Sequence, residues 1–114
     1  MPTLDAVPSI DVDTAAAIGD RSVLLDVREN QEWMGGHAPT SVHIPMSELP
    51  ARVDELDRTQ TIVCVCRSGN RSARVTAWLC AQGFDARNLT GGMHTWSTIG
   101  HPMVDHAGRP GVVV

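Results

Sequence analysis

Hydrophobic positions along the chain fall into short apolar runs that are separated by segments with helical spacing. The clearest runs are residues 23–27 and 61–65, which are almost continuously apolar. A strand has this composition when both of its faces are covered. We therefore expect two buried strands here. Shorter runs at residues 10–12, 42–44 and 86–89 are compatible with three more strands.

Two short helices are expected in the first third of the chain. Asp13 can cap a small helix over residues 14–18 that ends near Gly19, because an aspartate side chain accepts hydrogen bonds from the free N–H groups of a first turn. Residues 29–34 predict one or two helical turns, and the glycine pair at residues 35–36 stops them.

Three further helical patterns follow. Ser47 opens one that runs to Leu56, and Pro50 is tolerated in it only because it falls in the first turn. A longer helix is expected over about residues 71–82, where apolar side chains recur at helical spacing. The last helix is expected over residues 93–98, after a glycine pair.

Strands that alternate with helices predict an α/β fold. We expect a small, mainly parallel five-stranded sheet flanked by helices on both faces. A chain of 114 residues with 42% hydrophobic residues has the usual size and core content of one domain. We place the core of this domain, 1–114, at about residues 10–103 and a C-terminal tail at about residues 104–114, which packs on the domain or frays.

Composition narrows the classes of function. A formal charge of -4 argues against general binding to nucleic acid, which needs clustered positive charge. No run approaches the roughly 20 apolar residues that cross a bilayer, and the first residues lack the pattern of a secretory signal. The odd number of cysteines, three, favours reduced thiols over a disulfide framework. We therefore expect a soluble, cytoplasmic protein with no nucleic-acid or membrane partner.

The loop after the second buried strand is the segment that carries most of the chemistry. It reads Cys66, Arg67, Ser68, Gly69, Asn70, Arg71 and Ser72. Ligands of α/β sheets bind where a strand passes into a helix, and a helix N-terminus favours negative charge. Nearby cations such as Arg67 and Arg71 favour the thiolate of Cys66, and Gly69 lets successive N–H groups turn toward one centre. The pattern predicts a cradle for an anionic sulfur. A lone cysteine would instead favour a buried, inert thiol.

This loop resembles the active-site loop of the rhodanese family, and two other blocks agree in the same order. Residues 25–29, Leu-Asp-Val-Arg-Glu, together with Glu32, Trp33 and residues 36–39, resemble the family's Asp-x-Arg and Gly-His-Ile-Pro-Gly-Ala blocks. Residues 91–96 resemble its closing Gly-Gly-x-x-x-Trp block. The resemblance covers about residues 10–103. It departs from the family at Ala-Pro-Thr, residues 38–40, where Ile-Pro-Gly is common, which changes a turn.

The resemblance implies a thiosulfate sulfurtransferase that carries sulfur as a persulfide on Cys66. The backbone N–H groups of residues 67–72 would form the cradle, and Arg71 would also hold the loop closed. The donor would be thiosulfate or a persulfide, and the acceptor cyanide, a thiol or a protein cysteine. Asp26, Arg28 and Glu32 would support the structure by pairing charges. The resemblance implies no cofactor and no metal, and it leaves the oligomeric state open.

Two other functions stay open: a non-catalytic rhodanese-like module that binds a partner protein, and an arsenate reductase or phosphatase-like enzyme. Four residues separate Cys66 from Arg71. The oxyanion-processing relatives carry one residue more, which disfavours the second alternative. Cys64 and Cys80 are expected to pack in the core, with a resolving-thiol role for Cys64 as the alternative. The spacing of Cys64 and Cys66 is not that of a zinc site.

Overall fold

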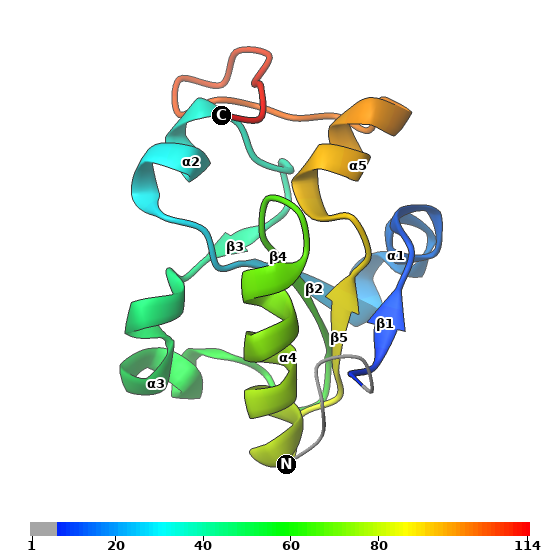
Figure 1. Ribbon diagram of the computed structural model, residues 1–114, viewed down its shortest axis with the longest axis vertical. Coiled ribbons are helices and arrows are strands. Elements are labelled where there is room, and N and C mark those ends of the chain that lie inside the picture. The colour runs from blue at the N-terminus through cyan, green and yellow to red at the C-terminus, as the bar shows by residue number, and fades with distance from the viewer. Residues whose placement is uncertain (1–6) are drawn as a thin grey trace.

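Five parallel strands form a single sheet in the computed structural model, which describes residues 7–114 (Figure 1). Their order across the sheet is β1-β5-β4-β2-β3, with β4 at the centre. The strands are β1 (Ser9–Ile10), β2 (Ser22–Asp26), β3 (Val42–His43), β4 (Thr61–Val65) and β5 (Ala86–Leu89). The predicted α/β fold with a parallel five-stranded sheet is confirmed, because all four neighbouring strand pairs run parallel.

Helices cover both faces of the sheet, as predicted. Side chains of α3 and α4 pack on one face and those of α1 and α5 on the other, while α2 lies at the carboxyl edge (Figure 1). The helices are α1 (Val12–Ile18), α2 (Asn30–Gly35), α3 (Leu49–Arg52), α4 (Asn70–Ala81) and α5 (Gly92–Ile99), with 3₁₀ turns at Gly19–Arg21, Met46–Glu48 and Val53–Glu55.

The central strand β4 explains why the sheet needs both layers. Successive side chains of a strand point to opposite faces. Ile62 and Cys64 therefore enter the core cluster with α4, while Val63 and Val65 enter the cluster with α1 and α5. Ile62, Cys64 and Val63 are completely buried. The nearly continuous apolar run in the sequence reflects this burial on two sides.

The predicted start of the first helix was wrong. Asp11, not Asp13, is the N-cap of α1, and its carboxylate accepts a 2.7 Å hydrogen bond from the Thr14 N–H. Val12, which the sequence assigned to a strand, is the first residue of the helix. Both aspartates suit a helix start, and the pairing of β1 with β5 ends at Ile10, which leaves Asp11 free to cap.

The helical pattern from Ser47 to Leu56 is not one helix. It divides into a 3₁₀ turn, the four-residue helix α3 and a second 3₁₀ turn. Pro50 has no N–H with which to continue a helix that begins earlier, and α3 accordingly starts at Leu49. The apolar spacing had predicted the buried positions Leu49 and Leu56, but not this break.

The C-terminal tail packs on the domain. We call residues 103–114 the C-terminal strap, because they follow α5 in the chain and lie against the end of α2 (Figure 1, red). Val104 exchanges two backbone hydrogen bonds of 2.9 Å with His37, and the Val112 N–H donates a 3.0 Å bond to the Gly35 carbonyl. These bonds hold the strap over the glycine pair that ends α2.

Candidate active site

The loop at residues 66–72 joins β4 to α4 at the carboxyl edge of the sheet. Cys66 directly follows the strand and only 1% of it is exposed. Gly69 is the N-cap of α4 and has a φ of 112°. A left-handed φ of this kind is accessible to glycine at little cost. It turns the chain back over the cysteine, so that the sulfur lies inside the loop.

The sulfur of Cys66 is surrounded by hydrogen-bond donors. The Gly69 N–H lies 3.0 Å from Sγ and the Ser72 hydroxyl lies 3.2 Å from it. Burial by itself raises the pKa of the Cys66 thiol, but hydrogen bonds from the Ser72 hydroxyl and from the N–H groups of Ser72, Gly69 and Ser68 outweigh it, so that the pKa lies below its usual value. The arrangement favours a thiolate or another anionic sulfur.

The N-terminus of α5 fastens the beginning of the loop. The N–H groups of Met93 and His94 each donate a 2.9 Å hydrogen bond, to the carbonyls of Cys66 and Arg67 respectively. Gly92, with a φ of 60°, allows this close approach, because a Cβ there would lie 2.4 Å from the Cys66 carbonyl oxygen. The glycine pair at residues 91–92 therefore allows the start of α5 to lie against the loop that leads into α4.

The two loop arginines have different partners. Arg71 forms a two-pronged ion pair with Glu32 of α2, with N–O distances of 2.7 and 2.8 Å. The hydrogen bonds from Arg71 lower the pKa of Glu32 to about 2. Arg67 is exposed, and its Nε donates a 3.2 Å hydrogen bond to the carbonyl oxygen of Val114. Arg71 thus ties the loop to α2, and Arg67 ties it to the C-terminal strap.

Asp26 and Arg28 form a buried ion pair next to this edge, and both side chains are completely buried. The Arg28 Nε and Nη2 donate to the two carboxylate oxygens of Asp26 at 2.9 and 2.8 Å. Nη2 also donates a 2.7 Å bond to the Gly36 carbonyl. Nη1 has no hydrogen-bond partner among the described residues. Through its bond to Gly36, the ion pair holds the turn that follows α2. Neither residue of the pair belongs to the cysteine loop.

Asn88 is a member of the site that sequence reasoning missed. It lies on β5, beside β4, and its Nδ2 donates a 3.2 Å hydrogen bond to the Gly69 carbonyl. Its Oδ1 lies 2.6 Å from the Ser72 hydroxyl. Nothing in the local pattern around residue 88 marks it, because its partners are 16 and 19 residues away in the chain. Only the strand order brings it to the loop.

The other two cysteines differ from Cys66. Cys64 packs in the core on the same side of the sheet as Cys66, as predicted, and burial raises its pKa to about 12. Cys80 is partly buried, packs against the same cluster and donates a weak hydrogen bond to the Ala86 carbonyl. All three cysteines are free thiols, and within residues 7–114 no group of three metal-binding side chains is present.

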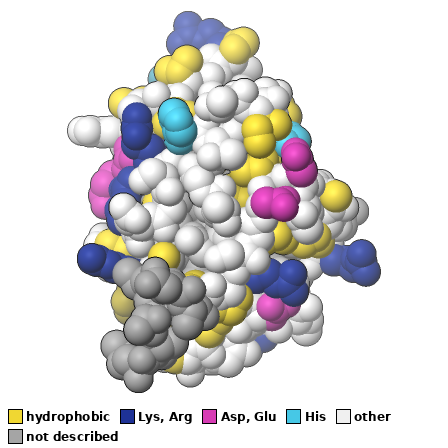
Figure 2. Space-filling model, turned by 45° about the vertical axis from the view of Figure 1, so that its right-hand side comes forward, with side chains coloured by type: hydrophobic (Ala, Val, Ile, Leu, Met, Phe, Trp, Pro, Cys, Tyr) yellow, Lys and Arg dark blue, Asp and Glu magenta, His cyan; other side chains and the backbone are white. Residues whose placement is uncertain are grey.

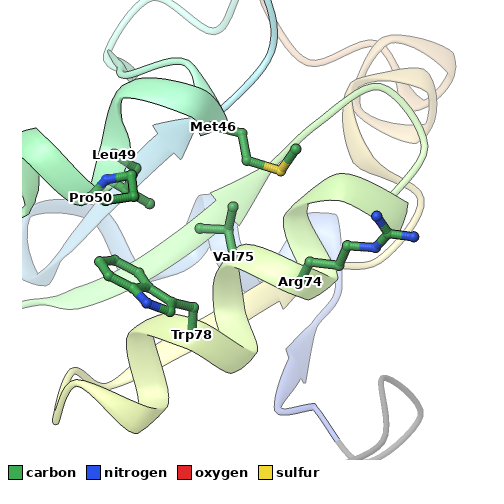
Figure 3. Close-up of a pocket in the computed structure, with 6 residues that line it drawn as sticks. All are labelled: Met46, Leu49, Pro50, Arg74, Val75 and Trp78. Atoms are coloured by element: carbon green, nitrogen blue, oxygen red, sulfur yellow. The ribbon is translucent and has the colours of Figure 1, made fainter.

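An apolar hollow lies beside α4, one turn beyond the loop. Figure 3 shows Met46, Leu49 and Pro50, from α3 and the preceding 3₁₀ turn, facing Val75 and Trp78 of α4, while the guanidinium end of Arg74 points away from them. Its lining residues are Met46, Leu49, Pro50, Arg74, Val75 and Trp78. Cys66 does not line this hollow, whose nearest lining residue in sequence, Arg74, follows the loop by two residues.

A scan of protein-family models identifies residues 12–99 as a rhodanese-like domain. The chain belongs to the rhodanese-like family. The matched segment contains the whole of the cysteine loop and both flanking blocks, while the C-terminal strap lies beyond it.

Named sulfurtransferases are among the relatives of this rhodanese-like chain. A protein named thiosulfate sulfurtransferase GlpE, from Pseudomonas syringae pv. syringae (strain B728a), is 37% identical over 78 residues, which cover 68% of this chain and 74% of that protein. A sulfurtransferase of Allochromatium vinosum is 36% identical over 83 residues, or 72% of this chain and 78% of its own length. These relatives support assignment to the rhodanese-like sulfurtransferases.

Solved structures agree with this assignment. The crystal structure of a rhodanese-related protein from Thermoplasma volcanium superposes with a TM-score of 0.81 and 32% sequence identity. The match covers 85% of this chain and 97% of that one. A rhodanese-like domain protein from Staphylococcus aureus gives a TM-score of 0.73 at 34% identity, covering 78% of this chain and 90% of its own.

The surface of the rhodanese-like fold carries charges of both signs. In Figure 2, acidic and basic side chains are interspersed on the face that is drawn, with hydrophobic side chains between them. None of the helices within residues 7–114 combines the length and the apolar character that a membrane span requires.

Proposed function

We propose that this protein is a sulfurtransferase that moves sulfane sulfur through a persulfide on Cys66, with thiosulfate or a persulfide as donor. The observation that carries the proposal is the set of donors around Sγ, with the Gly69 N–H at 3.0 Å and the Ser72 hydroxyl at 3.2 Å. Hydrogen bonds to an anionic sulfur stabilise it more than they stabilise a neutral thiol. The same donors therefore serve both the attacking thiolate and the thiolate that leaves.

The reaction has two steps. In the first, the Cys66 thiolate attacks the outer sulfur of thiosulfate, a new S–S bond forms, and the S–S bond of thiosulfate breaks as sulfite leaves with the electron pair. In the second, a thiolate or cyanide attacks the outer sulfur of the persulfide, and Cys66 Sγ leaves as a thiolate. A covalent intermediate of this kind leads to ping-pong kinetics.

Charge near the loop favours an anionic donor. Arg67 is exposed at the loop, and the side chain of Arg71 is about one-third exposed at 33%. The pairing of Arg71 with Glu32 offsets much of the charge of Arg71, and Arg67 adds a second positive charge at the loop. The backbone N–H groups do the rest, since they carry partial positive charge and need no counterion.

The length of the loop favours sulfur transfer over phosphate or arsenate chemistry. Four residues separate Cys66 from Arg71, and Gly69 and Ser72 enclose the sulfur within hydrogen-bonding distance. A tetrahedral oxyanion needs N–H groups arranged around several oxygens, whereas the donors here converge on one atom. A binding module without catalysis would have no use for a stabilised thiolate.

Intact-mass measurement after incubation with thiosulfate tests the proposal. The expected result is a gain of one sulfur atom that cyanide removes with release of thiocyanate. Cys66→Ser is expected to abolish both the mass gain and the release of thiocyanate. Cys80→Ser, which removes a partly buried thiol of α4, is the matched control and is expected to keep both. If the native chain gains no sulfur from thiosulfate or from a small-molecule persulfide and forms no thiocyanate, the proposal is wrong. Turnover of an aryl phosphate would instead support the phosphatase-like alternative.

A further inference from the structure

The orientation of the Asn88 side chain is set by its contact with the loop. The carbonyl oxygen of Gly69 can only accept hydrogen bonds, and it lies 3.2 Å from one end of the Asn88 amide. That end must be the NH₂ group, since an oxygen there would face another acceptor. The amide oxygen therefore faces Ser72, at 2.6 Å from its hydroxyl.

The Ser72 hydroxyl has one proton and two acceptors within reach. These are Oδ1 of Asn88 at 2.6 Å and Sγ of Cys66 at 3.2 Å. When the hydroxyl donates to Asn88, its oxygen can accept a hydrogen bond from a protonated Cys66 thiol. When Cys66 is a thiolate, the same hydroxyl donates to sulfur and leaves the Asn88 oxygen without this donor. The two acceptors compete for one proton.

Backbone anchors keep this arrangement rigid. Ser72 is completely buried in the first turns of α4, and its carbonyl accepts a 2.7 Å hydrogen bond from the Thr76 hydroxyl. Asn88 lies opposite Cys64 in the register of β4 and β5, and Cys64 comes two residues before Cys66 at the start of the loop. The hydroxyl can therefore rotate between its two acceptors while the heavy atoms stay in place.

We propose that Asn88 is a positioning residue that competes with the Cys66 sulfur for the proton of Ser72 and so sets how strongly the loop holds negative charge. This inference rests on the proposed function for its catalytic meaning. In the second step of sulfur transfer, the S–S bond of the persulfide breaks and its electron pair goes to Sγ. The Ser72 hydroxyl then rotates and donates its proton to Sγ instead of to Asn88. The weaker the Asn88 oxygen is as an acceptor, the more this hydrogen bond stabilises the leaving thiolate.

Two substitutions of Asn88 are expected to shift the titration of Cys66 in opposite directions. Asn88→Ala removes the competing acceptor and leaves the Ser72 proton to sulfur, so the pH midpoint of Cys66 alkylation falls. The Gly69 carbonyl keeps its 3.1 Å hydrogen bond from the Ala73 N–H and is not left unpaired. Asn88→Asp is a stronger acceptor and adds a negative charge, so the midpoint rises. A net hydrogen bond corresponds to a shift of about 0.5–1 pH unit.

The test measures the rate of iodoacetamide alkylation at Cys66 against pH, with the modified residue assigned by peptide fragmentation. In a Ser72→Ala background, Asn88→Ala is expected to leave the midpoint unchanged, because the shared proton is gone. Gln82→Ala, at an exposed amide side chain at the other end of α4, is the control and is expected to leave the native midpoint unchanged.

A shift in the same direction for both Asn88 variants would overturn the inference, as would an Asn88→Ala shift that persists without the Ser72 hydroxyl. If Asn88→Asp does not fold, the comparison of Asn88→Ala in the two backgrounds decides by itself. Alkylation needs no sulfur donor. The titration can therefore support or overturn the role of Asn88 whether or not the chain transfers sulfur.

Discussion

At the scale of single residues, the environment of each sulfur decides its chemistry. Cys64 and Cys66 lie on the same side of the sheet and both are almost fully buried. Burial raises the pKa of Cys64 to about 12, because little opposes it there. At Cys66 the same effect is outweighed by donors from the loop. Two cysteines that are separated by one residue in the sequence therefore differ in pKa, because only Cys66 lies beyond the end of the strand, where the loop supplies hydrogen-bond donors.

This difference predicts selective alkylation. We expect Cys66 to react with iodoacetamide with a pH midpoint below about 8.5, the usual value for a free thiol, while Cys64 stays unmodified in the folded protein. Ser72→Ala is expected to raise the Cys66 midpoint by about 0.5–1 pH unit, since one donor to the thiolate is lost. Peptide-resolved mass spectrometry across a pH series measures both. Reaction of Cys64 at the same rate as Cys66 would contradict the assignment.

The buried ion pair makes a prediction about stability. Asp26→Ala leaves the guanidinium of Arg28 buried without its counterion, and we expect a loss of about 3–5 kcal/mol in the free energy of unfolding. Asp54→Ala, at an exposed position, is the control and is expected to change it by no more than about 0.5 kcal/mol. Urea denaturation measures both. A small effect of Asp26→Ala would mean that Arg28 finds another partner.

At the scale of elements, α2 and α4 are joined across the carboxyl edge of the sheet. The helix α2 has six residues, which is too short to be stable in isolation. Its capping box between Glu29 and Glu32 stabilises its first turn. Glu32 also binds Arg71 at the start of α4, so one carboxylate serves both the cap of α2 and the attachment of the loop.

The Glu32–Arg71 pair predicts a pH-dependent contribution to stability. The pKa of Glu32 is lowered to about 2 in the folded protein, so its stabilisation is fully present above the ordinary glutamate pKa of about 4.3 and is lost as the pH falls below that. Glu32→Gln is expected to cost about 1 kcal/mol at pH 7. The difference in the free energy of unfolding between the variant and the native chain should decrease as the pH falls from about 4.3 to about 2.

Urea denaturation of both chains at several pH values measures this contribution. Glu55→Gln, in the exposed pair with Arg52, is the control, and its effect at neutral pH should be smaller because solvent screens an exposed pair. A Glu32→Gln effect that is equally large at pH 7 and near pH 2 would show that charge is not its cause.

At the scale of the whole molecule, the C-terminal strap closes the edge of the sheet that carries the site. It contacts the turn after α2 and, through Val114, the side chain of Arg67. Val113 packs against the core cluster that contains α1 and α5. The strap and α2 thereby lie together beside the loop at the carboxyl edge of the sheet (Figure 1).

The glycine pair under the strap predicts the effect of a single methyl group. A Cβ at Gly36 would lie 2.3 Å from the Val112 carbonyl oxygen and 2.6 Å from its N–H nitrogen, so Gly36→Ala is expected to displace the strap. Overpacking of this kind costs about 1–3 kcal/mol. Amide hydrogen exchange at Val104 and Val112 should become faster in the variant, while exchange in β4 stays slow. Unchanged protection of Val104 would show that the strap accommodates the methyl group.

Local patterns were enough to predict the strands at Thr61–Val65 and Ala86–Leu89, the parallel sheet and the layers of helices. A strand that is buried on both faces consists almost entirely of apolar residues, and such a run can be recognised from consecutive residues alone. The choice between Asp11 and Asp13 as a cap was not predictable in this way, since both residues suit the position and the end of strand pairing decided between them.

The sequence by itself determined the nucleophile candidate, the short loop around it and its place at the end of a buried strand, because these depend on neighbours in the chain. Only the tertiary structure decided which groups surround that loop. Asn88 reaches it from β5 and Glu32 from α2, and the strap reaches Arg67 from the other end of the chain. Such contacts depend on the order of strands in the sheet, which no local pattern around these residues encodes.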